Sequence, residues 1–597
     1  MQPTQRRSEE FDDEPRPAAK ASTGGYRPRT RLKGERGYVL IMSALLMLPL
    51  LAFAGFAVDI GYWYTHANRM QRAADAASLA GVVWMPNDEK AETIALETAN
   101  ANGFDDADPD IVVTVTPVGN RRLQVYIHDL SVDMYLSSLF LDQVDIERQA
   151  LAEYVQAVPM GSPDNTLGND PDRWSVSGYN RPYYWLNVSA PASTKQNGDR
   201  YTAGYCNAYS GCSGTDNLDY SSDGYFFKVT VDTKPASGDL LIDVFDPAYT
   251  NQGNTCTETN LPAAGSTWDS QAAALVAAGT VPSDAATRYV RAPSSGTDPN
   301  SQFCVADGAA GAATQDVNTS YIVRAPDNTP FDNYDNPVVC GKTFGHFDSS
   351  VVTLLQSSTV RSPENMTFAQ HFRRWTNICT IPWSSTVVGD YLLQITTTAD
   401  LSNPPTSLTT YDATVNTGGY NKYALRAGWG TNPSAASYAT GVNLFADGRL
   451  PVYVNQAGGG TSTNFYLARI VPEYAGQLLE LELFDIGDGP SGTTASISII
   501  APPDMTGGPI ASCTFIRDNA PPDIVVNTTC GITGLTSSTD QGRLRTVQIP
   551  LPAAYSCNAG SDYGCWFKIG LTYSPTVPTD QTTWSARVRG DPVRLVE

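Results

Sequence analysis

The feature that most constrains this chain is an uncharged, apolar run from Gly37 to Val58. An α-helix rises about 1.5 Å per residue, so about 22 residues span roughly 33 Å, enough to cross the hydrocarbon core of a bilayer. A cleaved signal peptide is one alternative, but its apolar core is only about 7 to 15 residues long. A buried helix of a soluble domain is another, although a helix that is apolar all round needs much protein to cover it. The run therefore predicts a transmembrane helix at residues 37–60.

The charges that flank this run predict its orientation. Five basic residues precede it closely, whereas its C-terminal side opens with Asp59; the five are Arg27, Arg29, Arg31, Lys33 and Arg36. The positive-inside rule then places the N-terminus in the cytoplasm and the bulk of the chain outside it. Residues 1–36 are rich in Arg, Pro, Glu and Asp, which predicts a disordered cytoplasmic tail. We expect a single-pass protein of the cell membrane with an extracytoplasmic C-terminal bulk.

The charge of the exported part argues against nucleic acid as a partner. The whole chain carries a net charge of −22, and residues 1–36 hold nine basic and six acidic residues, which leaves −25 for the rest. Such a surface repels phosphates and favours solubility or cation binding.

The cysteines predict an oxidising compartment. All ten lie beyond the apolar run, and their even number allows up to five disulfides. Short separations favour three pairs, Cys206–Cys212, Cys513–Cys530 and Cys557–Cys565, although spacing alone does not determine connectivity. Zinc is a weaker interpretation because the chain has no CxxC motif and only four histidines.

The residues after the span predict a small α+β domain at 61–155. A stripe of mostly small side chains recurs at alternating spacings of four and three, which predicts that the helix continues with one packed face; it comprises Trp63, Ala67, Met70, Ala74, Ala77, Gly81 and Trp84. The stripe packs either on the following elements, which we favour, or in an intermolecular coiled-coil seam. A second helix, two strands joined near Gly119, a helical segment around MYLSSLFL and a last strand follow.

Three motifs in this region carry a resemblance to a known family. Glu35–Gly37 reads ERG, Ala57–Gly61 reads AVDIG, and Gln71–Gly81 reads QRAADAASLAG. Together they resemble the N-terminal region of the TadE/TadG-like family of Flp (tight-adherence) pilus-assembly proteins, over about residues 34–155. The resemblance implies a pilin-like, membrane-anchored accessory component whose partners are pilus or envelope-assembly proteins.

The remaining three quarters of the chain predict β-sandwich architecture. Residues 156–180 have the composition of a linker, and short alternating strands follow. Four segments recur in the same order: GYFFKVTV matches NFYLARIV, DLLIDVFD matches QLLELELFD, GDYLLQITTT matches YGCWFKIGLTYS, and NKYALRAG matches TWSARVRG. We therefore expect two jelly-roll-like sandwiches, the first at 181–430 with a disulfide-bearing insertion and the second at 440–597. GDYLLQI and NKYALRA also resemble the closing strands of bacterial pre-peptidase C-terminal sandwiches.

Acidic residues at strand ends are the best candidates for a metal site. Asp243 and Asp246 in the first copy correspond to Asp485 and Asp488 in the second. Oxygen-rich loops of this kind can hold calcium, and hydrogen bonding of Asp to nearby backbone amides is the structural alternative. No nucleophile elbow, HExxH motif or phosphate loop is present, so we expect no enzyme activity.

Aromatic residues suggest a second kind of surface. Tyr183–Trp185 and four tyrosines lie among Gly, Asn and Ser; the four are Tyr201, Tyr205, Tyr209 and Tyr220. They predict either stacking on a surface glycan or protein, or filling of the core.

These observations favour a structural or adhesion component associated with Flp pilus assembly. A carbohydrate- or calcium-binding module on the same anchor is the alternative, and a cryptic extracellular hydrolase is the third.

Overall fold

A computed structural model of the protein describes residues 36–85, 88–118, 122–135, 137–139, 143–154, 158–173, 182–206, 216–247, 317, 319–327, 336–344, 374–397, 419–430, 441–454, 462–487, 492–519, 521–575, 580–589 and 593–596. The tail predicted at residues 1–36 lies outside this range apart from Arg36. Cys212, Cys256 and Cys304 lie outside it as well.

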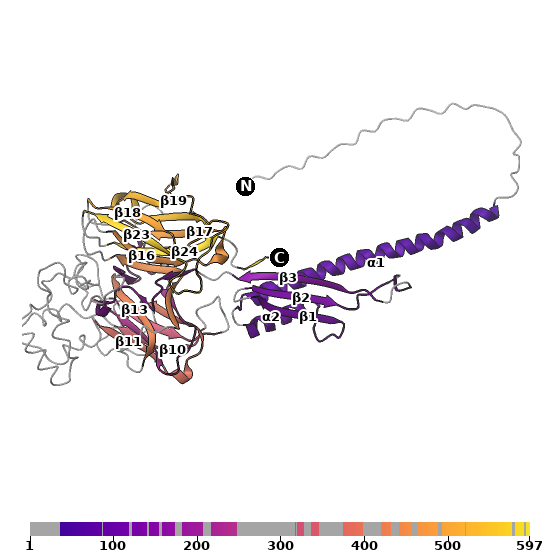
Figure 1. Ribbon diagram of the computed structural model, residues 1–597, viewed down its shortest axis with the longest axis horizontal. Helices are drawn as coiled ribbons and strands as arrows, with labels where there is room; N and C mark the ends of the chain where they lie inside the picture. The colour runs from indigo at the N-terminus through magenta and orange to yellow at the C-terminus, as the bar shows by residue number, and fades with distance from the viewer. Residues whose placement is uncertain are drawn as a thin grey trace, which may run out of the picture.

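One continuous helix, α1 (Arg36–Val82), contains both the predicted span and the stripe that follows it. Its first part is uncovered: Leu45 is 59% exposed and Phe53 is 75% exposed. Its most apolar window has a mean hydropathy of 2.3, so the helix is long and apolar enough to cross a membrane. Figure 1 shows this part projecting alone, away from the rest of the molecule.

The second part of α1 is the spine of a small domain, which we call the stem. The helix α2 (Asp88–Ala101) packs its buried Ala91, Ala95 and Ala99 against the small side chains of α1. A sheet lies alongside in the order β1-β2-β3-β25, built from β1 (Ile111–Val118), β2 (Arg122–Asp129), β3 (Ile146–Tyr154) and β25 (Val593–Leu595). The predicted helical segment around MYLSSLFL is the short 3₁₀ helix η1 (Ser137–Leu139).

The fourth strand of the stem comes from the far end of the chain. Leu595 lies opposite Ala152 on β3, and the backbone N–H of Val596 donates to the carbonyl of Leu151 at 2.8 Å. The chain therefore leaves the stem after β3, builds the sandwich, and returns to pair with β3.

The described residues between β3 and β25 form two large antiparallel sheets, and successive strands mostly alternate between them (Figure 1). The first, of ten strands, runs β10 (Val338–Phe344), β9 (Thr319–Arg324), β12 (Gly389–Thr396), β7 (Tyr225–Val231), β14 (Val442–Asp447), β4 (Pro159–Gly161), β16 (Ser462–Arg469), β23 (Trp566–Ser574), β18 (Thr494–Ile500), β21 (Gly531–Leu535). The second, of eleven strands, includes β11 (Trp375–Ile381), β8 (Asp239–Phe245), β13 (Tyr420–Gly430), β6 (Tyr184–Ser189), β15 (Arg449–Val454), β24 (Gln581–Arg589), β17 (Leu478–Phe484), β22 (Leu544–Pro550), β19 (Cys513–Arg517), β20 (Asp523–Asn527) in this order. The short β5 (Thr166–Leu167) pairs with β13.

The sequence repeat corresponds to a structural one. Strands β7–β14 form the first half of the sandwich and β16–β24 the second half, while β4, β6 and β15 lie where the halves meet. Outward from β14 and β4, the two middle strands of the first sheet, β7 and β12 in one half take the same positions as β16 and β23 in the other. In the second sheet, β13 and β8 correspond to β24 and β17. All four matched segments therefore occupy equivalent places, and a helix followed by β-sandwich architecture is confirmed.

The predicted linker at 156–180 has a different role where it is described. Val158, Met160 and Leu167 are buried in the core. Met160 on β4 pairs with Ala446 of the first half and Ala468 of the second. The polar composition of this segment did not reveal its three-residue strand, β4, which joins the two halves in the first sheet. Likewise β14, which falls in the range predicted for the second sandwich, pairs with β7 of the first.

Disulfides close both outer edges of the sandwich. Cys513–Cys530 and Cys557–Cys565 form as predicted. A third disulfide joins Cys340 on β10 to Cys379 on β11, the last strands of the two sheets in the first half. Cys206 is also disulfide-bonded.

Candidate functional site: the junction of anchor and stem

Asp59 is the first residue of α1 beyond the apolar run, and its carboxylate is fully buried. It accepts hydrogen bonds from the backbone N–H of Tyr135 at 2.9 Å and of Ser137 at 2.6 Å, and from the Ser137 hydroxyl at 2.6 Å. A buried carboxylate is stable only when such donors replace water. Asp59 therefore fixes the loop before η1 to the helix at the point where the helix leaves the predicted membrane span.

Three more contacts hold the end of β2 and the same loop over the next turns of α1. His66 Nε2 lies 2.8 Å from Asp129 Oδ2, and both side chains are largely buried. Trp63 donates from Nε1 to the carbonyl of Asp133 at 3.4 Å. The rings of Tyr62 and Tyr135 meet edge to face with centroids 5.4 Å apart. The described residues of the loop between β2 and β3 thus lie against the helix and form a packed collar at the junction.

The stripe predicted from the sequence is the buried face of α1 in the stem. Met70, Ala74 and Ala77 are fully buried in the stem core. A Cβ at Gly81 would lie 2.5 Å from Leu123 Cδ2 and 2.7 Å from the carbonyl of Ala91, so α1 approaches α2 and β2 too closely there for any side chain. The stripe packs within the chain, as the favoured alternative predicted.

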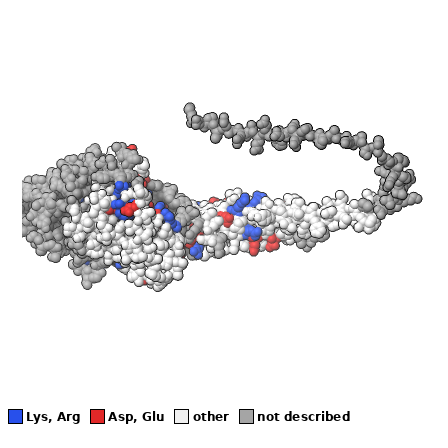
Figure 2. Space-filling model, turned by 90° about the horizontal axis from the view of Figure 1, so that it is seen from above, with Lys and Arg blue, Asp and Glu red and all other residues white. Residues whose placement is uncertain are grey.

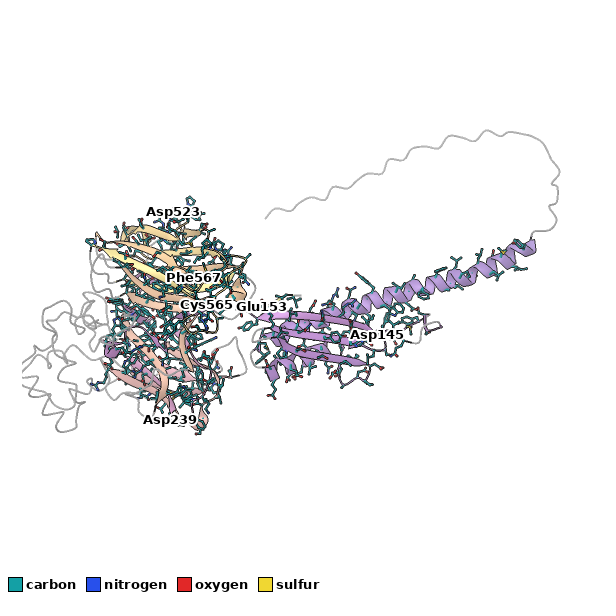
Figure 3. All side chains as sticks on the ribbon, in the orientation of Figure 1. Asp145, Glu153, Asp239, Asp523, Cys565 and Phe567 are labelled. Carbon is teal, nitrogen blue, oxygen red and sulfur yellow. A yellow bond between two sulfur atoms is a disulfide. The ribbon has the colours of Figure 1, made fainter. Side chains whose placement is uncertain are left out.

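The stem sheet links this collar to the sandwich. Figure 3 shows Asp145 near the projecting end of the sheet and Glu153 at its opposite end, facing the sandwich. Glu153 is buried and forms an ion pair with Arg122 at 3.2 Å. Both chain segments that connect stem and sandwich pass this end, one after β3 and one before β25.

The predicted calcium ligands lie in a different environment from the one the sequence suggested. Asp243 is fully buried; its Oδ2 pairs with Arg426 Nη2 at 2.8 Å and its Oδ1 accepts from Asn377 at 3.0 Å. Burial raises the pKa of Asp243, and Arg426 partly offsets this. Arg426 is the cross-strand partner of Asp243 on β13, a pairing that sequence alone does not reveal. The Asp243 carboxylate therefore already has an ion-pair partner and a hydrogen-bond donor within the sheet.

The structure describes two of the other three predicted ligands. Asp246 is buried. Asp485 is buried with a positive φ of 60°, and it accepts a hydrogen bond from the backbone N–H of Gly542. Asp488 lies outside the described residues. Within the described ranges no three His, Cys, Asp or Glu side chains gather as a metal site would require, so calcium stays a prediction.

Most of the aromatic residues singled out above belong to the core. Tyr184, Trp185 and Tyr201 are buried. Tyr205 and Tyr220 are exposed by 50% and 37%, and Tyr209 lies outside the described residues. Packing rather than glycan stacking explains the first three.

A comparison with protein families finds a match over the helix that forms this junction. Residues 37–84 match the Tad family, described as "Putative Flp pilus-assembly TadE/G-like". This TadE/G-like segment is the whole length of α1 from Gly37 onward, including Asp59, Trp63, His66 and the buried stripe. It supports an association with Flp pilus assembly, and it is shorter than the predicted resemblance at 34–155. No curated protein and no solved structure matched the chain.

Proposed function

We propose that the chain is a single-pass, extracytoplasmic structural or adhesion component of a Flp-type pilus-assembly system. The observation that supports this most is the form of the TadE/G-like segment, in which one helix is apolar and uncovered at first and then becomes the spine of a folded stem. The buried Asp59 collar lies at the transition. The basic residues before the span and Asp59 after it support an N-terminus in the cytoplasm.

The sandwich is the part presented to the outside in this proposal. Two chain segments attach it to the stem, because β25 returns to β3. Two attachments restrict rotation more than one linker does, so the sandwich would be held at a defined distance from the membrane. This role is mechanical and includes no catalytic step.

The membrane part of the proposal is tested by a charge in the span. Leu50 is 67% exposed in the apolar run, and a charged residue at the centre of a spanning helix costs about 2.5–3.5 kcal/mol. We expect Leu50→Arg to move the protein out of the carbonate-resistant membrane fraction. Leu218→Arg, at a position of the sandwich that is 94% exposed, is the matched control and should leave the distribution unchanged.

The partner part is tested by crosslinking and pull-down of the native protein from cells that make the pilus. Pilus-assembly proteins or filament subunits should be recovered with it. Recovery of the chain from the membrane without any of them would contradict the proposal.

Calcium binding at the strand ends is a separate proposal. In the first half it rests on Asp246, because Asp243 already pairs with Arg426, and in the second half it rests on Asp485 and Asp488. The melting temperature of the full chain should rise in excess calcium and fall with chelator. Equal melting temperatures in the two conditions would end this proposal.

A further inference from the structure

A cavity of about 590 Å³ lies at the outer edge of the second half, where both sheets end. Its volume is within the range of about 300–1,000 Å³ that is usual for small-ligand sites. The last strands of the two sheets, β20 and β21, contribute to its wall, and the short helix α7 (Ser537–Asp540) follows β21. The Cys513–Cys530 disulfide ties β19 to the turn between β20 and β21, which holds this wall in place.

Two arginines line the cavity from neighbouring strands. Arg517 on β19 and Arg545 on β22 are cross-strand partners, an arrangement that is unfavourable for like charges unless other groups compensate. Arg517 pairs with Asp523 at 3.2 Å and donates to the carbonyl of Thr539 at 3.2 Å. Arg545 pairs with Asp540.

These ion pairs leave at least one N–H group of each guanidinium without a hydrogen-bond partner. Arg545 is 3% exposed, yet its Nε and Nη1 have no hydrogen-bond partner among the described residues, and neither does Nε of Arg517. Buried donors without acceptors are rare in folded proteins and call for an explanation, such as a water, an ion or a ligand that binds there. The wall of the cavity therefore contains buried N–H groups that still lack an acceptor.

The other residues that line the cavity indicate which class of ligand carries that acceptor. Hydroxyl groups of Ser and Thr line the cavity together with the aliphatic side chains of Val525 and Ile532. Hydroxyls both donate and accept, which suits a polyhydroxylated ligand with apolar C–H faces. The carboxylates of Asp523 and Asp540 would repel a doubly charged phosphate but tolerate a single carboxylate that is bound by the arginines.

We propose that this cavity binds a sugar acid, such as a hexuronate unit of an acidic glycan. The carboxylate takes the free N–H groups of Arg545 and Arg517, and the sugar hydroxyls bond to the Ser and Thr side chains. This site is independent of the pilus-assembly role. Figure 2 shows that the described surface on the side of β18 and β19 is mostly uncharged, with one mixed group of basic and acidic side chains and further basic side chains toward the stem.

Calorimetric titration of the full chain in detergent tests the proposal, with digalacturonate as the probe. We expect a Kd at or below about 1 mM, and binding at least about tenfold weaker for cellobiose, which lacks the carboxylate, and for acetate, which lacks the sugar. Equal binding of cellobiose or acetate, or no binding of digalacturonate at about 10 mM, would overturn it.

Variants locate the site. Arg545→Gln and Arg517→Gln should each weaken digalacturonate binding by roughly tenfold or more, because charge-assisted hydrogen bonds are lost. Arg543→Gln is the matched control, since Arg543 lies on the same stretch, pairs with Asp518 at 3.9 Å and does not line the cavity. Because Arg545 is buried and its variant could fail to fold, Thr533→Trp provides a second test: Thr533 is exposed on β21 and lines the cavity, so the indole should block entry. Unchanged binding in both Arg517→Gln and Thr533→Trp would refute the assignment.

Discussion

At the scale of single residues, Asp59 is the clearest case of a side chain whose role depends on distant partners. We expect Asp59→Asn to weaken the collar, because the hydrogen bonds from Tyr135 and Ser137 lose a charged acceptor. A hydrogen bond to a charged group contributes about 1.5–3 kcal/mol, so amide exchange at Tyr135 and Ser137 should accelerate by roughly tenfold or more. Asp75→Asn on the same helix is the control: Asp75 accepts a hydrogen bond from Gln71 within α1, and the loss of its charge should leave those two amides unchanged.

Two glycines of α1 provide a matched pair at the same scale. A methyl group at Gly81 would meet Leu123 and Ala91, so Gly81→Ala should destabilise the stem by about 1–3 kcal/mol through overpacking. A methyl group at Gly61 meets nothing within 4 Å, and Gly61→Ala should stabilise the helix by about 0.5–1 kcal/mol. Hydrogen exchange of the backbone amides in the buried part of α2 measures the effects of both substitutions. Similar effects of the two substitutions would contradict the packing described here.

At the scale of elements, β17, β22 and β24 share a charge cluster around Glu480. Gln548 and Arg587 lie opposite Glu480 on the two neighbouring strands and bond to its carboxylate, and Arg589 lies 3.1 Å from it. Burial raises the pKa of Glu480, but the hydrogen bonds from Arg587 and Gln548 outweigh it, so the pKa lies below its usual value. The unfolded chain then binds this proton more readily than the folded one.

The lowered pKa of Glu480 determines how its contribution to the stability of the fold changes with pH. The contribution of Glu480 is present above its unfolded pKa of about 4.5 and is lost as the pH falls through the folded value. We expect Glu480→Gln to lower the melting temperature at about pH 7 and to match the native protein more closely at about pH 3. Glu473→Gln, at an exposed position in the turn before β17, is the control. A constant difference between Glu480→Gln and the native protein across this range would contradict the interpretation.

At the scale of the whole molecule, the two halves of the sandwich share both sheets and one hydrophobic core. We therefore expect the sandwich to unfold in one cooperative calorimetric transition rather than two, with equal calorimetric and van't Hoff enthalpies. Met160→Pro should lower the temperature of this transition, since proline at β4 removes the pairing that joins the halves in the first sheet, while β15 still joins them in the second. Two transitions in the native protein would show that the halves are independent.

Local patterns in the sequence determined much of this architecture. The length and flanking charge of the apolar run predicted the helix, and the spacing of small residues predicted its buried face. Two disulfides between cysteines less than 20 residues apart were predictable because short loops favour closure. The repeat predicted which strands are equivalent, since alternation and turn residues are encoded within each strand.

Only the tertiary structure decided which distant segments meet. The pairing of β25 with β3, the Cys340–Cys379 disulfide, the Asp243–Arg426 pair and the facing arginines at 517 and 545 all depend on which strand edges remain free after the rest has folded. Backbone hydrogen bonding is the same for every strand, so a sequence can indicate that a strand forms without indicating its neighbour. Asp243 illustrates the result: its place at a strand end suggested calcium, and its neighbour on β13 gave it a buried ion pair instead.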